Sequence, residues 1–177
     1  CDGRLAFYLY CISRVSTYLK CLNKLVGLQS AHMKVFIEQA ANKLEKNIFD
    51  KKSGNLIKTV PINLPYPFPY GFIINTKADD GQNLDCYVIT DDKIEAGSMI
   101  ECEPLGMVEW FEDGAEDHKI LAVPFGADQK ISKNVKNRIT KFALGFYTGQ
   151  SHKRYQLGEF HGKQKAVSLI NRSLDAR

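Results

Sequence analysis

Residues 65–72 read Pro-Tyr-Pro-Phe-Pro-Tyr-Gly-Phe, and this stretch sets the class of fold. Its alternating prolines remove backbone N–H donors and fix φ, so the stretch excludes a helix and predicts an extended entry into a strand. β-rich runs follow at residues 71–76, 84–90, 99–110 and 119–123, with glycine and proline between them. Short strands with such punctuation are typical of a small β-barrel.

Helical periodicity appears after these strands. One face of a helix is marked by five apolar residues: Ile131, Val135, Ile139, Phe142 and Phe146. A strand around residues 155–157 and a helix over about 164–174 are predicted to follow. On the N-terminal side, residues 35–37 read as a short strand and residues 50–55 as a turn. The whole pattern predicts an α+β, mainly β domain, namely a small closed β-barrel with packed helices.

Size and composition limit the function classes. The chain has 177 residues, 44% of them hydrophobic and 25% charged, which fits one folded domain. The formal charge of +4 is spread among interspersed acids and bases. That balance is compatible with a phosphate-rich ligand but lacks the clustered lysines and arginines of an extended nucleic-acid footprint, so no nucleic-acid partner is predicted. No stretch reaches the ~18 uncharged apolar residues of a spanning helix, so a transmembrane segment is not predicted either.

The cysteines indicate a reducing compartment. There are five, too widely spaced for a zinc pair and odd in number, which gives no disulfide framework. Cys86 and Cys102 lie in apolar, strand-like runs and read as buried free thiols. The predicted location is the cytoplasm.

Residues 1–32 differ in character from residues 33–177. Their aliphatic side chains recur at helical spacing among four basic residues, and Asp2 is their only acid. This predicts a basic amphipathic helix, which fits an organelle-targeting segment, a membrane-surface helix or a packing helix. Met33 marks an alternative start, in which case the segment is a leader or a cloning-derived extension, and we prefer that interpretation. Targeting would place the protein in a mitochondrion or another organelle.

Two loops carry clustered acids. Residues 79–85 read Asp-Asp-Gly-Gln-Asn-Leu-Asp and lead into a strand, while residues 112–117 read Glu-Asp-Gly-Ala-Glu-Asp and are followed by Lys119. Asp80 and Asp85 bracket a turn, so that both carboxylates can converge on one cation, and oxygen-only ligands favour Mg²⁺ or Mn²⁺ over zinc. Solvated turns are the simpler interpretation of each loop alone. Together the loops supply what phosphoanhydride hydrolysis needs: carboxylates for divalent ions and a cation for the leaving phosphate.

Several motifs in a fixed order resemble family I inorganic pyrophosphatase. The order is Tyr66–Phe72, the acidic loop Asp80–Asp85, the turn 96–98, the second acidic loop and the run 119–124, Lys-Ile-Leu-Ala-Val-Pro. Residues 100–107, Ile-Glu-Cys-Glu-Pro-Leu-Gly-Met, match a further family segment. The resemblance runs from about residue 37 to residue 162 and implies an OB-like barrel, hydrolysis of pyrophosphate, Mg²⁺ dependence and a homo-oligomer.

The resemblance also implies a metal site. The family loop reads Asp-x-Asp-Pro-x-Asp, and Asp80 and Asp85 match its first and last acids. Asp117 matches the third acid of the primary site. Glu112 stands where the family has an aspartate that holds further, substrate-bound metals. The expected cofactor is Mg²⁺, with Mn²⁺ as an alternative.

The middle of the signature loop departs from the family pattern, because Gln82 and Asn83 replace its second acid and its proline. That acid is the family's general base, whereas an amide orients water but does not take its proton in the usual way. Asp79 or Asp85 remains as a proton acceptor. Catalytic roles are therefore expected for four residues: Asp85, Lys119, Tyr70 and Gln82.

The resemblance implies phosphate contacts for Lys46, Tyr70, Lys119 and Tyr147. It adds Tyr66, which matches another tyrosine near the site, and Glu38, which matches a family Glu, to the substrate-binding residues. Other family positions are altered. Ile48 stands where the family has a metal-linked Glu, and Thr148 replaces a phosphate-binding Lys. The arginine expected within residues 55–65 is missing, and Lys58, the only cation there, is a candidate partial substitute.

Three functions remain open from the sequence. The first is pyrophosphate hydrolysis with metal-activated water. The second is a degenerate relative that binds metal or phosphate, or serves as a structural subunit, without efficient turnover. The third is nucleic-acid binding by an OB-type barrel, with Tyr66, Phe68 and Tyr70 as stacking platforms, and it ranks last because these residues belong to the pyrophosphatase motif.

Overall fold

The computed structural model describes residues 32–146 and 154–175. In chain order the elements are β1 (Met33–Gln39), β2 (Glu45–Phe49), β3 (Leu56–Pro61), β4 (Tyr70–Ile73), β5 (Asp85–Val88), β6 (Met99–Glu112), β7 (Ala115–Glu116), β8 (Lys119–Pro124), α2 (Lys133–Phe146), β9 (Tyr155–Gly162) and α3 (Lys163–Asp175). The amphipathic helix predicted within residues 1–32 falls almost entirely outside the described residues.

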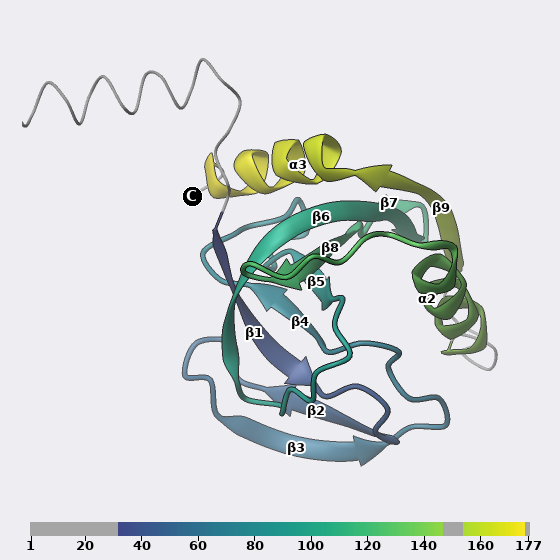
Figure 1. Cartoon of the computed structure of the whole chain (residues 1–177). Coiled ribbons are helices and arrows are strands. Elements are labelled where there is room, and N and C mark those ends of the chain that lie inside the picture. The colour runs from purple at the N-terminus through teal and green to yellow at the C-terminus, as the bar shows by residue number, and fades with distance from the viewer. Residues whose placement is uncertain (1–31, 147–153, 176–177) are drawn as a thin grey trace, which may run out of the picture. The chain divides into compact units, whose positions relative to one another are not determined.

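Five strands close into a mixed β-barrel (Figure 1). They lie in the order β1-β4-β5-β8-β6, and β1 also pairs with β6, which completes the ring. Only the β5–β8 pair in this ring is parallel. β7 and β9 pair antiparallel with the long strand β6 outside this ring, and β2 with β3 forms a separate hairpin. The predicted small closed barrel with packed helices is confirmed.

Two glycines allow the barrel strands to approach closely. A Cβ atom added to Gly71 of β4 would lie 1.8 Å from the carbonyl oxygen of Phe36 on β1. One added to Gly106 of β6 would lie 2.2 Å from the carbonyl oxygen of His161 on β9. Real Cβ atoms do not come so near, so these positions require glycine.

Two apolar clusters hold the fold together. The first lies among the barrel strands and α3, and it includes Val35, Ile120 and Ile170. The second packs the buried face of α2 against the aromatic residues of the loop before β4 and against β6 and β8. α2 begins after Ser132, whose hydroxyl oxygen accepts a hydrogen bond from the Val135 N–H at 3.3 Å, which satisfies a donor that the first helical turn leaves open.

The predicted strands and helices are found, but their lengths differ: the strands predicted at 71–76 and 84–90 are shorter, at Tyr70–Ile73 and Asp85–Val88, and others are longer. The first strand spans Met33–Gln39 and the last spans Tyr155–Gly162. The predicted helix face is confirmed at Val135, Ile139 and Phe142, which are buried. The hairpin β2–β3 was not predicted, because nearly every residue of β3 is exposed and no polar–apolar alternation marks it. Among the described residues, no helix is long and apolar enough to cross a membrane.

Candidate active site

The parallel pairing of β5 with β8 brings an acid and a base together at the ends of two strands. Asp85 opens β5 and Lys119 opens β8. Because Cys86 pairs with Ile120, the residues one position earlier lie side by side. The Lys119 Nζ atom is 2.6 Å from Asp85 Oδ2. An ion pair between residues 34 positions apart in sequence therefore follows from the strand register.

Tyr70 reaches the same carboxylate oxygen from β4. Its phenol donates a hydrogen bond to Asp85 Oδ2 at 2.5 Å. The Tyr66 ring stacks against the Tyr70 ring with centroids 5.1 Å apart, and Tyr87 lies on Tyr70 at 4.8 Å. Burial, with the nearby Asp85 charge, raises the pKa of Tyr70 well above its usual value, so the phenol stays protonated and remains a donor.

Asp117 completes a three-residue cluster with Asp85 and Lys119. Its backbone N–H donates to the Trp110 carbonyl at 2.8 Å, which fixes the loop between β7 and β8. Its Oδ1 atom lies 2.6 Å from Lys119 Nζ. Lys119 is only 4% exposed. Burial lowers the pKa of the Lys119 ammonium, but the charges of Asp85 and Asp117 outweigh it, so the net pKa is raised and the side chain remains a cation.

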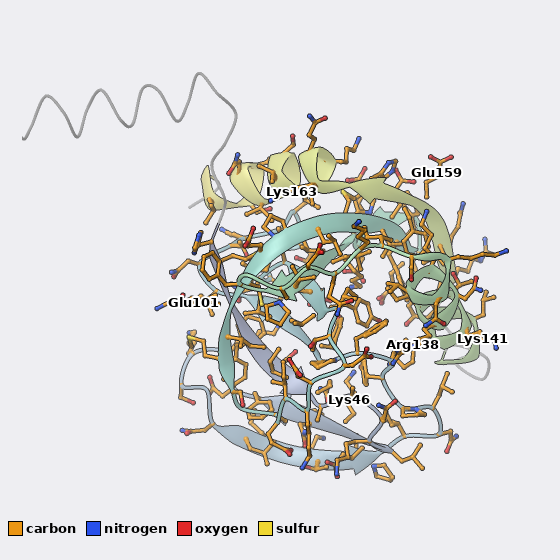
Figure 2. All side chains as sticks on the ribbon, viewed as in Figure 1. Lys46, Glu101, Arg138, Lys141, Glu159 and Lys163 are labelled. Carbon is orange, nitrogen blue, oxygen red and sulfur yellow. The ribbon has the colours of Figure 1, made fainter. Side chains whose placement is uncertain are left out.

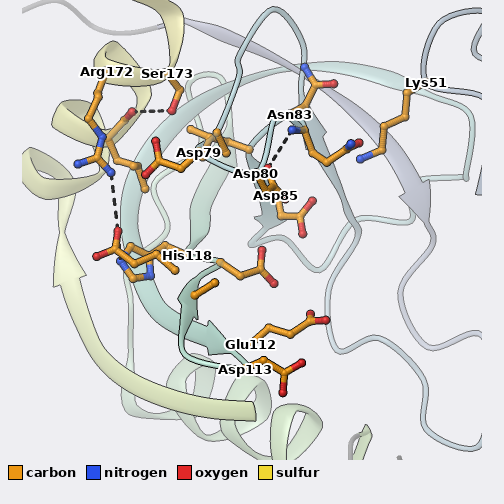
Figure 3. A pocket seen from close by; sticks show the side chains of 17 residues that line it. Lys51, Asp79, Asp80, Asn83, Asp85, Glu112, Asp113, His118, Arg172 and Ser173 are labelled. Carbon is orange, nitrogen blue, oxygen red and sulfur yellow. Dashed lines mark hydrogen bonds and ion pairs between the residues drawn. The ribbon is translucent and has the colours of Figure 1, made fainter. Parts of the chain in front are cut away.

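The acidic loops enclose a cavity of about 410 Å³, which we call the acidic cavity (Figure 3). The loop between β4 and β5 forms one wall, the β6–β7 turn forms another, and α3 contributes to a third. Its lining carboxylates are Asp79, Asp80, Asp85, Glu112, Asp113, Glu116 and Asp117. Two fixed cations, Lys51 and Arg172, line the same cavity. The concentration of negative charge distinguishes this space from an ordinary polar cleft.

A second cavity of about 500 Å³, which we call the groove, adjoins the acidic cavity. Asp85, Glu112, Asp117 and Lys51 line both. The remaining lining residues come mainly from β1, β2 and the aromatic residues near β4: Glu38, Gln39, Lys46, Asn47, Ile48, Phe49, Tyr66, Tyr70, Lys119 and Tyr155. Lysines and phenols therefore face the groove, while carboxylates dominate the acidic cavity.

Two buried hydrogen bonds between the Gln39 side chain and the Asn47 backbone hold the β2–β3 hairpin, whose β2 residues line the groove. The Gln39 side chain donates to the Asn47 carbonyl at 2.7 Å and accepts from the Asn47 N–H at 2.7 Å. This pairing fastens β2 to β1 beside Lys46, which is labelled in Figure 2. Glu38 lies where the β1–β4 register shifts between Ile37 and Gln39, and such irregularities redirect a side chain.

Electrostatics in the site favour an added cation. Burial raises the pKa of Asp117, and the charges of Asp85 and Asp80 raise it further, against the opposing effect of Lys119. Burial likewise raises the pKa of Glu38. The lysine thus compensates only part of the local negative charge.

The donor set fits a hard divalent cation. All the clustered donors are carboxylate oxygens, which Mg²⁺ and Mn²⁺ prefer. Within residues 32–146 and 154–175, no three His, Cys, Asp or Glu side chains stand close enough together to count as a ready-made metal group. In the structure, the Lys119 ammonium bridges Asp85 and Asp117.

The signature loop is held by local hydrogen bonds. The Asp80 carboxylate accepts from the Gln82 N–H at 2.8 Å, and Gly81 has a φ of +80°, which favours glycine. The Asn83 side chain donates to the Thr76 carbonyl at 2.8 Å. Asn83, which replaces the family's proline, therefore secures the loop, while Gln82 lines the acidic cavity.

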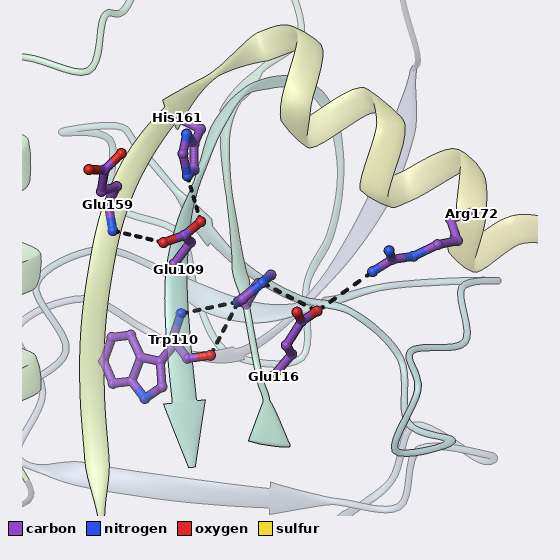
Figure 4. Close-up of polar contacts among 7 residues, drawn as sticks. Glu109, Trp110, Glu116, Glu159, His161 and Arg172 are labelled. Atoms are coloured by element: carbon purple, nitrogen blue, oxygen red, sulfur yellow. Dashed lines mark hydrogen bonds and ion pairs between the residues drawn. The ribbon is translucent and has the colours of Figure 1, made fainter. Parts of the chain in front are cut away.

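Polar contacts join β6 to β9 and β7 to α3 (Figure 4). Glu109 accepts from the Glu159 N–H at 3.2 Å, and its second oxygen lies 2.8 Å from His161 Nε2. Arg172 of α3 approaches Glu116 at 3.9 Å. These contacts hold the C-terminal elements beside the acidic loops.

Nearly all of the predicted site residues lie together. Asp80, Asp85, Asp117, Glu112 and Gln82 line the acidic cavity. The groove is lined by Glu38, Lys46, Tyr66, Tyr70 and Lys119. Tyr147 and the replaced position Thr148 lie outside the described residues.

Other residues clarify the altered positions. Ile48 lines the groove, whereas Lys58, the candidate substitute for the arginine, lines neither cavity. Lys51, Tyr155 and Arg172 line the site and were not predicted. In the sequence these three residues differ from many solvated side chains in neither charge nor aromatic character, so no pattern pointed to them.

Comparisons with known proteins agree with this geometry. The family model "Inorganic pyrophosphatase" matches residues 35–176. The inorganic pyrophosphatase of Nostoc sp. is 39% identical over 151 residues, which covers 80% of this chain and 89% of that protein. The Buchnera aphidicola inorganic pyrophosphatase is 45% identical over 121 residues, or 63% of this chain and 69% of that one. The Helicobacter pylori inorganic pyrophosphatase structure has a TM-score of 0.74 at 25% identity, covering 82% of this chain and 92% of that chain. The chain belongs to the inorganic pyrophosphatase family.

Proposed function

We propose that this protein hydrolyses inorganic pyrophosphate to two phosphates with the help of Mg²⁺. The observation that carries the proposal is the junction of an acidic cavity and a groove lined by lysines and phenols, which share Asp85, Glu112 and Asp117. A metal–pyrophosphate complex requires a cation-binding space next to an anion-binding space, and the acidic cavity and the groove adjoin in this way. The comparisons support enzymatic hydrolysis over a non-catalytic role.

The metal would be held by Asp80, Asp85 and Asp117, with Glu112 toward the groove. When bound, Mg²⁺ neutralises phosphoryl oxygens and acidifies a coordinated water, and Mn²⁺ has the same ligand preference. The family as a whole implies a divalent metal.

The groove would hold the phosphates. Lys46 and Lys119 supply positive charge, and Tyr66 and Tyr70 line the wall beside them. Charge-assisted contacts to phosphate oxygens are the strong ones, so these lysines are expected to dominate substrate affinity. Glu38 lies among them, and we assign it to the substrate end of the site. Tyr147 remains a predicted phosphate contact.

Gln82 would orient the attacking water, and the proton of that water would pass to the Asp79 carboxylate. The Asp85 Oδ2 atom already accepts from Tyr70 and Lys119. In contrast, the Asp79 carboxylate lines the acidic cavity and has no hydrogen bond or ion pair with another described residue. A carboxylate with open lone pairs is the better proton acceptor in this geometry.

Phosphate release from pyrophosphate tests the proposal. The purified protein is assayed with Mg²⁺, with Mn²⁺ and with excess chelator. Release that depends on the metal and obeys saturation kinetics supports hydrolysis. A parent protein that releases no phosphate above the chelated control at any metal concentration refutes it.

We also infer that the working protein is a cytoplasmic homo-oligomer and that residues 1–32 form a segment distinct from residues 33–177. The exposed apolar residues Leu56 (54%) and Ile57 (63%) of β3 support self-association. Cys86 and Cys102 are buried free thiols, which fits a reducing compartment. Sedimentation of the full chain and of residues 33–177 tests the homo-oligomer, since a monomer in both cases contradicts it.

A further inference from the structure

Lys51 occupies a position at the site that no sequence motif marks. It lies in the turn between β2 and β3, directly after Asp50, whose carboxylate accepts hydrogen bonds from the Lys52 and Ser53 N–H groups at 2.8 and 3.1 Å. Those bonds fix the turn close to the base of the Lys51 side chain. The Lys51 ammonium lies 5.2 Å from the centroid of the Phe72 ring on β4, so the side chain lies against the barrel.

The lysine stands where the two cavities meet. It lines both the acidic cavity and the groove, and among the described residues it is the only cation that does so. Figure 3 shows its nitrogen directed toward the side of the acidic cavity that holds Asn83 and Asp85. Burial raises the pKa of Glu38, and the nearby Lys51 charge opposes that rise, which agrees with the position of the ammonium beside the groove.

The Lys51 ammonium influences Glu38 through its charge, but unlike Lys119 it has no direct ion pair among the described residues. Lys119 is neutralised by Asp85 and Asp117 at 2.6 Å each. Lys51 makes no ion pair or hydrogen bond through its ammonium with any residue in the described ranges. A surface cation held against an aromatic ring and aimed at an anion site retains its full charge for a ligand.

The chain lacks a cation that the family motif leads one to expect. The segment Asn55–Pro65 carries no arginine. Its one cation, Lys58, lines neither cavity, although it pairs across the hairpin with Ile48. A polyanionic substrate that enters beside seven carboxylates needs positive charge at the junction, and Lys51 is placed there.

We propose that Lys51 is a substrate-binding cation that contacts the phosphate lying at the junction of the acidic cavity and the groove. The proposal rests on the proposed pyrophosphate hydrolysis and adds a residue to it. In this arrangement the turn between β2 and β3 supplies the phosphate-binding cation in place of the missing arginine. Since a point charge suffices for this contact, arginine can replace lysine there.

Steady-state kinetics of Lys51→Met, Lys51→Arg and the matched control Lys52→Met test the proposal. Lys52 is the neighbouring exposed lysine of the same turn and lines neither cavity. We expect Lys51→Met to raise KM for magnesium pyrophosphate about 10-fold, as loss of one charge-assisted contact does, with kcat changed less than about 3-fold. Lys51→Arg should keep KM within about 3-fold of the parent, and Lys52→Met should leave it unchanged.

Three results overturn the proposal. One is a KM for Lys51→Met within about twofold of the parent. Another is an equal rise for Lys52→Met, which would indicate a general field effect. The third is a shifted pH profile of kcat with an unchanged KM, which would mean that Lys51 acts only through Glu38.

Binding measurements separate this proposal from the proposed function. Calorimetry with imidodiphosphate and Mg²⁺, a non-hydrolysable probe, compares the parent with Lys51→Met. A parent that binds the probe but releases no phosphate refutes hydrolysis and leaves the lysine contact to be judged by the same titration. An affinity about 10-fold weaker in Lys51→Met, with Mg²⁺ binding alone unchanged, supports the contact, and equal affinities refute it.

Discussion

The acidic cavity and the groove are built from neighbouring strands, yet they differ in how closely they keep the pattern of the family. In the acidic cavity Asp80, Asp85 and Asp117 are retained, while Gln82 replaces an acid and Glu112 replaces an aspartate. In the groove, Ile48 replaces an acid and the expected arginine is absent. The difference teaches that the three acids of the primary metal site, whose oxygens must converge on one cation, are kept while the acids around them vary. The phosphate side can take its charge from another loop, since a cation reaches a polyanion from several directions.

The largest effect is expected for Asp85→Asn, because Asp85 lines both spaces and accepts hydrogen bonds from Tyr70 and Lys119. Loss of its charge removes a proposed metal ligand and leaves the Lys119 ammonium with one partner. We expect kcat/KM to fall by about 1,000-fold or more in the phosphate-release assay. Asp92→Asn, which changes an exposed carboxylate away from the site, is the control. A loss of less than tenfold would mean that the acidic cavity is not the metal side.

The second effect is a gain, in Gln82→Asp. A carboxylate at this position restores a general base, which typically contributes ~10²–10⁴ in rate, so we expect kcat to rise about 100-fold. Gln129→Asp, on an exposed loop remote from both cavities, controls for added charge. If Asp79 accepts the proton of the attacking water in the parent protein, Asp79→Asn should reduce kcat strongly in the parent. The same substitution should reduce kcat only weakly in the Gln82→Asp variant. Equal losses in the two backgrounds would contradict that assignment.

A smaller effect is expected for Tyr70→Phe, which keeps the ring stacking with Tyr66 but removes the donor to Asp85. We expect kcat/KM to fall about 10-fold, in line with one hydrogen bond to a charged group. Because the pKa of Tyr70 lies well above its usual value, the loss should be the same from pH 6 to pH 9. A loss that appears only at one end of that range would indicate that the phenol titrates.

The smallest effect is expected for Lys58→Met. This lysine is exposed on β3 and lines neither cavity, so KM for pyrophosphate should change less than about twofold. Comparison with Lys51→Met then decides which cation serves the groove. A larger rise in KM for Lys58→Met than for Lys51→Met would reverse the assignment.

The sequence predicted the barrel well because its strands are buried and strongly punctuated. β5 and β8 are apolar runs that start at charged residues, and α2 shows a clear apolar face. The hairpin β2–β3 could not be predicted in this way, because exposed Leu56 and Ile57 break any alternation between an inner and an outer face.

The site was predictable only in part. The acids of the two loops were identified by motif order, but their convergence with Lys119 depends on the register between β5 and β8, which spacing along the chain does not reveal. Lys51 was missed for a related reason. A lysine in a polar turn looks solvated until the fold places that turn beside the barrel.

The single parallel pairing in the barrel also determines when the site comes into existence during folding. Asp85 and Lys119 are separated by the whole of β6, and their pairing closes a long loop instead of extending a hairpin. Such contacts form late, since the entropy of loop closure must be overcome before they contribute. Local hairpins of this chain can therefore assemble while the site is still open. Recovery of enzymatic activity should thus report completion of the β5–β8 seam, whereas recovery of β-structure alone should not.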